Sequence, residues 1–585
     1  MPPSFRSFPS PGSLASQAGS TLRRFPFVMA CAAVSSFAAI RAIDAVVNPE
    51  PHWRLLAAAT LGLPLLTALA VTAERRPGFP AQLGAALFGV AILAAFYAAW
   101  PRWTDPQRAF HYVQLSLAFH LSAAVLPFAG RPLHRAFWQY NRRLLERFLV
   151  AAVFAAVIFF GLALALASLD KLLGFDIEPQ AYGRVWAMAA FVIATWIFLA
   201  GVPADVAALE GDAEYPRLLE ILAQRILVPL VSLYIIILMV YLVRVVVTRE
   251  WPSGWIGWLV SALGVTGTLV LLLVQPMAGG RAQGWIARFA RVYWLAVIPA
   301  VVMLWLAVRQ RVVQYGITEA RYAVIVLSVW LFAMAVFSSL RRSADLRVIP
   351  ASLALLALGT VAGPWSAYPV SFRSQYGRLQ AMLTANGMLA NGKLRPPARP
   401  VPNIDRREIA AAVSYLIDRQ GRPAVSAWFA AAGVRVDHAM AAAGPGDPGA
   451  RVARAIGVPA PGFSLAQGDF HAVDTGALDV AGYDVLIRRI LPRATAGDTG
   501  YLAVFDTAAR AVRVQHGEQV LLTLPLDPAL DAAASDTTRR ASDPIVVRGR
   551  DGGWDAVLRI TGLVGTDSTG RFRDVSGPIL LRKIR

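Results

Sequence analysis

The sequence has little of what usually holds a small secreted domain or a zinc site together. Only one of its 585 residues is a cysteine, Cys31. One cysteine allows neither an intramolecular disulfide framework nor the paired cysteines of a zinc ribbon. Any part of the chain outside the cytoplasm must therefore be stabilised by its own hydrophobic core.

Charge is also scarce. Charged residues make up 16% of the chain and hydrophobic residues 56%, whereas an ordinary globular protein has about 25% charged residues. Apolar runs of about 20 residues recur along the sequence, which is the length needed to cross a bilayer. The composition therefore predicts an integral membrane protein.

Acidic residues are scarcer than basic ones, at 36 against 56, so the net charge is +20. Such an excess can indicate nucleic-acid binding, but here the basic residues flank apolar runs and do not form one patch. Arginines in that position set the orientation of membrane helices. We therefore expect membrane lipids as partners and no nucleic acid.

The apolar runs predict an α-helical polytopic membrane bundle of about eleven transmembrane helices, followed by a small α+β soluble domain. Residues 1–22 are rich in Ser, Pro and Gly and are expected to be disordered. The bundle covers 23–368, an amphipathic connector and linker 369–402, and the α+β domain 403–585. The predicted spans are 25–47, 53–73, 81–100, 109–129, 144–168, 185–203, 224–247, 254–276, 288–308, 322–340 and 348–367.

Arginine counts in the loops predict the orientation. The positive-inside rule places the arginine-rich set of loops in the cytoplasm. The N-terminus is then cytoplasmic and, with an odd number of spans, the C-terminal domain is periplasmic in a bacterial inner membrane. The arginine-rich set holds Arg23, Arg24, Arg75, Arg76, Arg131, Arg135, Arg142, Arg143, Arg281, Arg288, Arg291, Arg341, Arg342 and Arg347. The poorer set holds Arg102, Arg108, Lys171, Arg249, Arg309 and Arg311.

The loop 204–222 differs from the other loops on that side because it is acidic. Its first interpretation is a solvated connection between helices. The alternative is a docking surface for a basic partner.

After Trp365 the sequence loses its long apolar runs. Residues 372–386 predict an amphipathic helix with Phe372, Tyr376, Leu379 and Leu383 on its buried face. We expect this helix to lie on the outer membrane surface or on the bundle; the alternative is that it is the first helix of the soluble core. Helices are expected from Asp405, over 423–432 and from Asp447-Pro448. Strands are expected at 482–490, 501–506, 510–515, 519–524, 544–548, 554–562 and 578–584, with a long loop at 527–543.

Three motifs carry a resemblance to a known group. They are YGITEARY from Tyr315, GPWSAYPVSFRSQYGRL from Gly363 and REIAAAVSYLIDRQG from Arg407. At these motifs the chain resembles the bacterial domain-of-unknown-function 4153 family of polytopic membrane proteins. The resemblance extends from the first helix into the tail. It implies an integral membrane protein and assigns no activity or catalytic residue.

Polar residues inside membrane helices are rare and often functional. Arg41 and Asp44 lie three residues apart late in the first span, where they could pair on one helical face. The alternative is a gate or proton site. His120 lies in the fourth span with His111, but nine residues separate them, so they face opposite sides of a straight helix and cannot hold one metal.

Three arginines stand on the arginine-poor side. Arg309, Arg311 and Arg321 flank Gly316-Ile317-Thr318. Thr318 suits a helix N-cap and Glu319 the positive end of the following helix, which leaves the arginines unexplained. They could bind lipid phosphates, but we favour pairing with acidic residues of the tail.

No catalytic motif is recognisable in the tail, which has no Gly-x-Ser-x-Gly, His-Glu-x-x-His or phosphate loop. The acidic residues around Asp469, Asp474 and Asp484 are interpreted as turn residues rather than a cation site. No catalytic residue, metal or cofactor is therefore assigned, and enzymatic activity is left open, with a non-enzyme favoured.

We therefore expect an inner-membrane protein of undefined activity whose extracytoplasmic domain senses, binds or scaffolds in the cell envelope, with a protein partner there. One alternative is a small-solute transporter or permease. The other is a membrane-embedded transferase at the outer leaflet, for which the carboxylates between Asp170 and Glu178 are the candidates.

Overall fold

The computed structural model of the chain describes residues 19–584 with internal gaps. The gaps are residues 46–47, 76–77, 213, 249–254, 276–282, 341–344, 398, 442–447, 459–469, 472–479, 481, 489, 492–499, 508, 518, 531–543 and 567–571. Residues 1–18 of the predicted N-terminal tail and 531–543 of the predicted loop lie outside the described residues. So do Asp447, at the predicted start of a helix, and Arg76, Arg249, Arg281, Arg341 and Arg342, which were counted for orientation.

The chain divides into two compact units. The first comprises Met1–Arg378 with Asp418–Gly421, and the second Leu379–Ile417 with Arg422–Arg585. The division falls inside the predicted connector 369–402.

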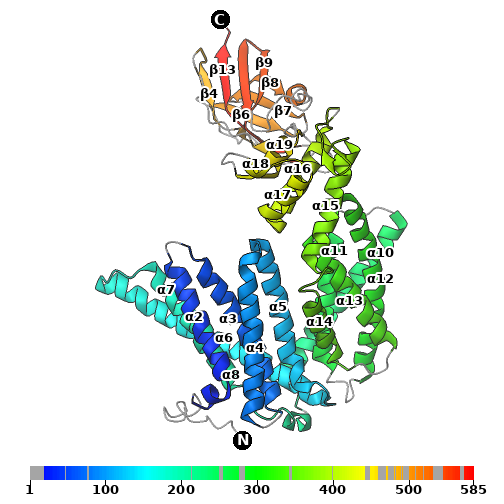
Figure 1. Cartoon of the computed structure of the whole chain (residues 1–585). Coiled ribbons are helices and arrows are strands. Elements are labelled where there is room, and N and C mark those ends of the chain that lie inside the picture. The colour runs from blue at the N-terminus through cyan, green and yellow to red at the C-terminus, as the bar shows by residue number, and fades with distance from the viewer. Residues whose placement is uncertain are drawn as a thin grey trace. The chain divides into compact units, whose positions relative to one another are not determined.

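Within the described residues, ten helices are long and apolar enough to cross a membrane, which confirms the predicted bundle (Figure 1). Nine of them each contain one long helix of the first unit: α2 (Pro26–Asp44), α3 (Glu50–Ala73), α4 (Phe79–Ala99), α5 (Asp105–Val125), α6 (His134–Leu173), α10 (Val228–Thr248), α11 (Trp255–Val274), α12 (Gln283–Tyr315) and α13 (Glu319–Leu340). The other is a composite of α7 (Pro179–Ala187), the π-helical turn η3 (Met188–Ile193) and α8 (Ala194–Ala200). The short α9 (Arg217–Ile221) and the π-helical turn η5 (Leu222–Leu227) lead into α10.

Proline begins many of these helices. It stands at the first or second position of α2, α3, α4, α5 and α7, where its missing N–H leaves no helical hydrogen bond unmade. At the start of α5, Thr104 and Gln107 add a reciprocal capping box, which satisfies two more exposed N–H groups. The helix starts are therefore encoded locally.

The predicted eleventh span, 348–367, is not one continuous helix. It begins as α14 (Val348–Gly359), and the chain then turns before α15 (Ala367–Ala385). In the turn, Gly363 has φ +95°, which a side chain would strain. Twelve helical residues reach about 18 Å, less than the roughly 30 Å hydrocarbon core.

The membrane unit has two hydrophobic cores. The N-terminal core is formed by α2–α6 and α8, with residues such as Leu61, Phe119 and Tyr140. The C-terminal core is formed by α10–α13, with residues such as Leu263 and Tyr293. Helix α14 contributes to both, through Ala357 to the N-terminal core and Ile349 to the C-terminal core.

A stacked aromatic pair gives a second link between the two halves. The rings of Trp138 and Tyr215 stack at 4.9 Å. Trp138 Nε1 donates to the Leu272 carbonyl at 3.1 Å and the Tyr215 hydroxyl to the Leu273 carbonyl at 3.0 Å, both at the end of α11. Burial raises the pKa of Tyr215 to about 12, so its hydroxyl stays a donor at neutral pH.

The second unit is the predicted α+β domain. Its helices are α16 (Asn403–Gln420), α17 (Arg422–Ala431), α18 (Asp437–Ala441) and α19 (Pro448–Ala455). Its strands are β1 (Leu389–Ala390), β2 (Lys393–Leu394), β3 (Phe470–His471), β4 (Val485–Ile487), β5 (Ile490–Leu491), β6 (Tyr501–Asp506), β7 (Ala511–His516), β8 (Gln519–Pro525), β9 (Ile545–Asp551), β10 (Trp554–Ile560), β11 (Gly562–Thr566), β12 (Phe572–Ser576) and β13 (Ile579–Lys583).

Two four-stranded sheets, in the orders β4-β13-β10-β9 and β5-β6-β7-β8, enclose one core. A three-stranded sheet β12-β11-β3 and the hairpin β1-β2 complete the strands described. Neighbouring strands pair antiparallel, except that β5 and β6 are parallel. Alternating side chains, such as Phe505 on β6 and Val547 on β9, fill the core.

Candidate functional site

The segment 345–378, which we call the bridging segment, joins the two halves of the membrane unit. It contains α14, the turn after it and α15 as far as the end of the first unit. Two of the family-like motifs meet on it, because GPWSAYPVSFRSQYGRL lies within it and YGITEARY lies against α15.

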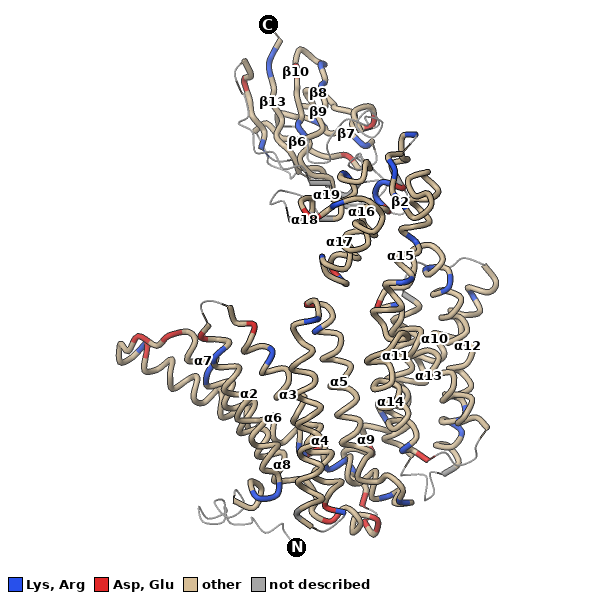
Figure 2. Tube along the Cα trace, in the orientation of Figure 1, with Lys and Arg blue, Asp and Glu red and all other residues tan. Residues whose placement is uncertain are grey.

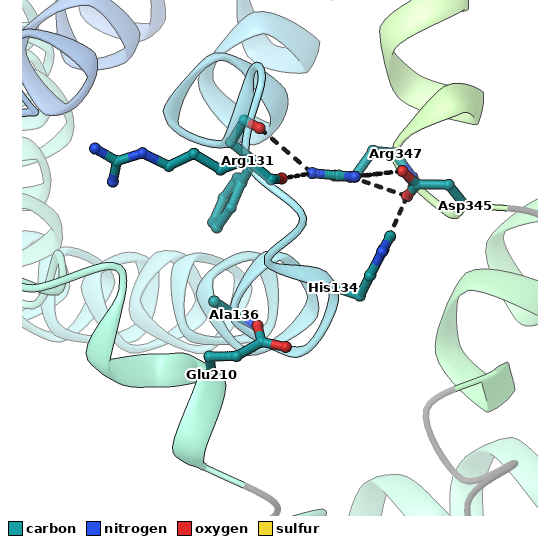
Figure 3. Close-up of polar contacts among 7 residues, drawn as sticks. Arg131, His134, Ala136, Glu210, Asp345 and Arg347 are labelled. Atoms are coloured by element: carbon teal, nitrogen blue, oxygen red, sulfur yellow. Dashed lines mark hydrogen bonds and ion pairs between the residues drawn. The ribbon is translucent and has the colours of Figure 1, made fainter.

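At its start, Arg347 holds the bridging segment to the turn that precedes α6 (Figure 3). Its guanidinium donates to the carbonyl of Arg131, and to that of Phe128 at 3.4 Å. Asp345 orients it: Arg347 Nε lies 2.9 Å from one carboxylate oxygen and 2.8 Å from the other. A planar guanidinium can bind a carboxylate and carbonyls at once, which lysine cannot.

His134, the first residue of α6, completes this cluster, with Nδ1 3.4 Å from Asp345 Oδ1. Burial of the Asp345 carboxyl acts to raise its pKa, but hydrogen bonds and charge from Arg347 outweigh this and leave the pKa below its ordinary 3.8. Asp345 is thus an anion at neutral pH, and it fixes Arg347 for the carbonyls of the neighbouring half.

The acidic loop 204–222 lies beside this cluster, and side chains and backbone groups of α6 bind its carboxylates. Glu210 accepts the backbone N–H of Ala136 at 2.9 Å and so caps the start of α6 (Figure 3). Arg143 pairs with Asp212 at 2.8 Å. A backbone N–H from Glu214 and then Arg143 hold the pKa of Asp212 below its ordinary value.

Two further side chains hold this loop and the residues just before it. Gln139 donates to the carbonyls of Asp212 and Glu214 at 3.1 and 2.8 Å. Arg24 binds Glu74 and donates to the carbonyl of Val202 at 2.7 Å. These contacts support the interpretation of the loop as a structural connection, and its docking to a basic partner stays a prediction. Figure 2 shows charge of both signs at this end of the unit.

Midway along the bridging segment, α5 holds the end of α14. The side-chain amide of Gln114 donates to the Ala357 carbonyl at 3.0 Å and to Thr360 Oγ1 at 2.7 Å. These bonds occupy acceptors at the last turn of α14, where carbonyls lose their helical partners. The interruption of the predicted eleventh span is therefore satisfied by a neighbouring helix.

Past the turn, Tyr368 packs against the first turns of α5. Its ring lies 5.7 Å from the rings of both Phe110 and His111, and the side chain is 5% exposed. Burial raises the pKa of Tyr368 to about 12. The hydroxyl therefore remains protonated at every physiological pH.

Helix α15 docks onto the loop between α12 and α13 through polar side chains. Ser371 Oγ donates to Glu319 Oε1 at 2.7 Å, and both residues are buried. Ser374 Oγ accepts the backbone N–H of Ile317 at 2.8 Å. Gln375 Nε2 donates to the Tyr315 carbonyl at 2.8 Å. Buried polar groups are retained only with partners, and here each has one.

The glycine of the Gly-Ile-Thr turn permits this close approach. Gly316 has φ +69°, and a Cβ there would lie 2.7 Å from Gln375 Nε2. Arg321 Nη1 donates to the Gly316 carbonyl at 2.7 Å, and its guanidinium lies 5.7 Å from the centre of the Tyr315 ring. Arg321 therefore fixes the loop on which α15 docks.

The buried face of α15 differs from the predicted one. Tyr368, Ser371, Gln375, Leu379 and Leu383 are buried, whereas Phe372 and Tyr376 are half-buried and stack on each other at 5.5 Å. The stripe is displaced because polar bonds, not apolar area, orient the first half of the helix. A hydrophobic pattern cannot reveal such a face.

The other predicted site residues do not join this cluster. Asp44 pairs with Arg184 at 3.0 Å, while Arg41 lies exposed. Arg309 and Arg311 are exposed near the end of α12, so their pairing with the tail stays a prediction. His120 lies on a cavity in the N-terminal half.

The groups that suggested catalysis or metal binding are engaged elsewhere or not described. Asp170 pairs with Lys171 and Glu178 with Arg184. Asp469 and Asp474 lie outside the described residues. Among the residues that the structure does describe, none form a cluster of three metal-binding side chains. The contacts described for the bridging segment thus connect the two halves of the membrane unit.

Comparison with known proteins supports the resemblance at the motifs that begin at Tyr315 and Gly363, whereas the motif from Arg407 lies outside the family match. No solved structure matches the chain. The uncharacterized protein PM1469 of Pasteurella multocida (strain Pm70) is 25% identical over 253 residues, which cover 42% of this chain and 42% of that protein. The match thus spans less than half of either chain. The family model for the domain of unknown function DUF4153 matches residues 27–383, from α2 to near the end of α15. The chain therefore belongs to the DUF4153 family of integral membrane proteins.

Proposed function

We propose that this protein is a multi-pass protein of the bacterial inner membrane that holds its C-terminal domain on the periplasmic side, where the domain senses, binds or scaffolds in the cell envelope. The observation that carries the proposal is the course of the bridging segment along α5. No catalytic role is required of it.

That course supports an eleventh crossing. Arg347 contacts the carbonyl of Phe128, just after the end of α5, and Tyr368 contacts Phe110 near its beginning. Phe110 and Phe128 lie 18 residues apart, which at helical rise is about 27 Å and close to the hydrocarbon thickness. A short helix with a satisfied turn can therefore cross where no continuous helix does.

Eleven crossings place the two ends of the bundle on opposite sides. The loops rich in arginine, including Arg131 and Arg135, mark the cytoplasmic side under the positive-inside rule. The N-terminus is then cytoplasmic and the domain that follows α15 is periplasmic. The domain's disulfide-free core suits either compartment, so the orientation depends on the crossing count.

The β-rich domain supports a binding or scaffolding role through its own surface. Val520 on β8 and Val546 on β9 are 50% and 43% exposed, and the two strands pack together. These strands are the outer strands of the two four-stranded sheets, and an outer strand offers backbone groups to which a partner's strand can add. We propose an envelope protein as that partner.

Reporter fusions test the orientation. Alkaline phosphatase fused after Arg585 should be active, because it folds only in the periplasm, and the same enzyme inserted at Gly130, in the exposed turn before α6, should be inactive. The opposite pair of activities would overturn the proposed topology and, with it, the periplasmic role.

Site-specific photocrosslinking in intact cells tests the binding role. A photoreactive residue at Val520 and at Val546 should give an adduct with the same envelope protein. The adduct at Val520 should disappear in a Val546→Lys background, and the exposed control position Arg435 should give none. Adducts absent from both valine positions, or equal at Arg435, would contradict the role.

A further inference from the structure

We propose that an open cavity between helices of the N-terminal half, part of whose wall is exposed, binds a neutral lipophile whose polar head is a hydroxyl group. The cavity has a volume of about 900 Å³, within the usual range for small-molecule sites of about 300–1,000 Å³. Its walls come from α3, α5, α6 and the composite helix α7–η3–α8. All of these belong to membrane-spanning helices, so its ligand enters from the bilayer.

The walls exclude a charged ligand head. Aliphatic and aromatic side chains such as Leu63, Phe148, Phe159 and Phe191 dominate them. Among the described residues that line the cavity, none is Asp, Glu, Lys or Arg. A phosphate or ammonium group brought inside would lose water without gaining a counter-charge, which is strongly unfavourable.

A line of hydrogen-bonding groups nevertheless crosses the apolar wall. Tyr112, Ser116 and His120 recur at every fourth residue of α5 and so form one stripe on the helix. Thr60 of α3 stands opposite, its hydroxyl 3.0 Å from that of Tyr112. These groups lie near the middle of their spans, so the polar part of the ligand is held deep in the membrane.

The hydrogen bonds within this line determine what it offers. Thr60 Oγ1 donates its one proton to a carbonyl of its own helix, that of Leu56 at 2.9 Å or Ala57 at 3.1 Å. With that proton engaged, the arrangement that satisfies all three contacts has Tyr112 donating to Thr60. The lone pairs of the Tyr112 oxygen remain to accept from a ligand.

His120 offers an acceptor in the same way. Its Nδ1 lies 2.7 Å from the Ser116 carbonyl, a distance at which Nδ1 must carry the proton and donate it. The neutral ring then has its acceptor lone pair on Nε2. A third acceptor is the carbonyl of Thr60, because Pro64, four residues on in α3, has no N–H to bond it.

Several hydrogen-bond acceptors in an uncharged, apolar cavity select an apolar ligand that carries a hydrogen-bond donor. A hydroxyl group on a long apolar chain meets both demands, whereas an ether or ester of the same chain meets only the apolar one. Two membrane sources share this chemistry, an isoprenoid alcohol and a diacylglycerol. Neither needs the C-terminal domain, so the inference is independent of the proposed function.

Equilibrium binding to the full-length protein in nanodiscs tests the inference. The probes are geranylgeraniol, its O-methyl ether, dioleoylglycerol and phosphatidylglycerol. Geranylgeraniol or dioleoylglycerol should bind about 10-fold more tightly than the ether, as expected for one hydrogen bond in an apolar site. If geranylgeraniol binds more tightly than dioleoylglycerol, the natural ligand is an isoprenoid alcohol. If dioleoylglycerol binds more tightly, the natural ligand is a diacylglycerol.

Matched variants locate the binding. Tyr112→Phe should weaken the alcohol about 10-fold and leave the ether unchanged. Ala152→Trp, which fills the cavity from α6, should abolish binding of both. Tyr234→Phe removes a tyrosine hydroxyl in α10, outside the cavity, and should change neither. Equal binding of alcohol and ether, tight binding of phosphatidylglycerol, or retained binding in Ala152→Trp would overturn the proposal.

Discussion

The hydroxyl of Ser371 donates to the buried carboxylate of Glu319 at 2.7 Å, joining α15 to the first residue of α13. The bond ties the last membrane-unit helix to a loop fixed by Arg321. The position of α15 is thereby set by polar contacts before the chain enters the C-terminal domain.

Loss of that bond should destabilise the membrane unit. Ser371→Ala leaves one Glu319 oxygen without this donor, at a cost of about 1–3 kcal/mol for a buried group. Glu319→Gln keeps an acceptor and should cost less. Thermal melts in detergent measure both, and the double variant should cost less than the sum of the single variants. Additive losses would mean that the two side chains are not coupled.

Gly316→Ala should loosen the docking of α15. The residue has φ +69°, and the added Cβ would approach Gln375 Nε2. A left-handed backbone alone costs about 1–2 kcal/mol with a side chain, so a lower Tm is expected. Gly161→Ala is the control, since nothing lies within 4 Å of a Cβ there. An equal Tm for both variants would contradict the close approach.

Acid should weaken the cluster at Asp345. Its folded-state pKa lies below the ordinary 3.8, so its contribution to stability is complete above that value and is lost as pH falls through the folded-state pKa. Between about pH 5 and about pH 3, the native protein should therefore lose more Tm than Asp345→Asn does. The exposed Asp176→Asn should behave like the native protein. Parallel losses in all three would refute the assignment.

Spin labels should report a docked α15. With Cys31, the single native cysteine, replaced by alanine, labels can be placed singly along the helix. A label at Ser371 or Gln375 should be immobile, and one at Arg373 or Gly377 mobile, because only the first two positions are buried. Equal mobility at all four positions would indicate a flexible tether in place of a docked helix.

The C-terminal domain should need more chain than sequence patterns suggest. Leu383 and Met388 are fully buried, and Asn386 donates to Asp405 at 2.9 Å. The segment 379–585 should therefore melt cooperatively, and the predicted domain 403–585 should be less stable by about 2 kcal/mol or more, as for loss of one buried leucine. Circular dichroism melts of the two segments compare them; equal stability would favour the shorter boundary.

Local patterns predicted much of this fold. Strand β6 begins and ends at the predicted residues, because alternation and flanking turns act over short distances. The ten long spans follow from apolar length alone. Strand β12 was not predicted; charged residues interrupt its apolar pattern, and its pairing with β11 comes from the sheet.

The candidate site was less accessible to sequence reasoning. Asp345 and Arg347 stand two residues apart, a spacing that does not place them on one helical face. The carbonyls that Arg347 binds lie more than 200 residues away. Asp44 pairs with Arg184 in a distant helix and not with its near neighbour Arg41. Within the candidate site, only the Gly-Ile-Thr turn could be recognised from the sequence, because glycine is favoured where φ is positive.

The position of α14 in both hydrophobic cores has a consequence for the order of assembly. Phe128 and Arg347 are separated by 219 residues, and a ribosome adding about 5–20 residues per second needs roughly 10–40 s to synthesise that interval. During this time the first helices reside in the bilayer without the segment that completes their core. Insertion of α14 therefore completes the joining of two nascent half-bundles that Trp138 and Tyr215 can already link through α11.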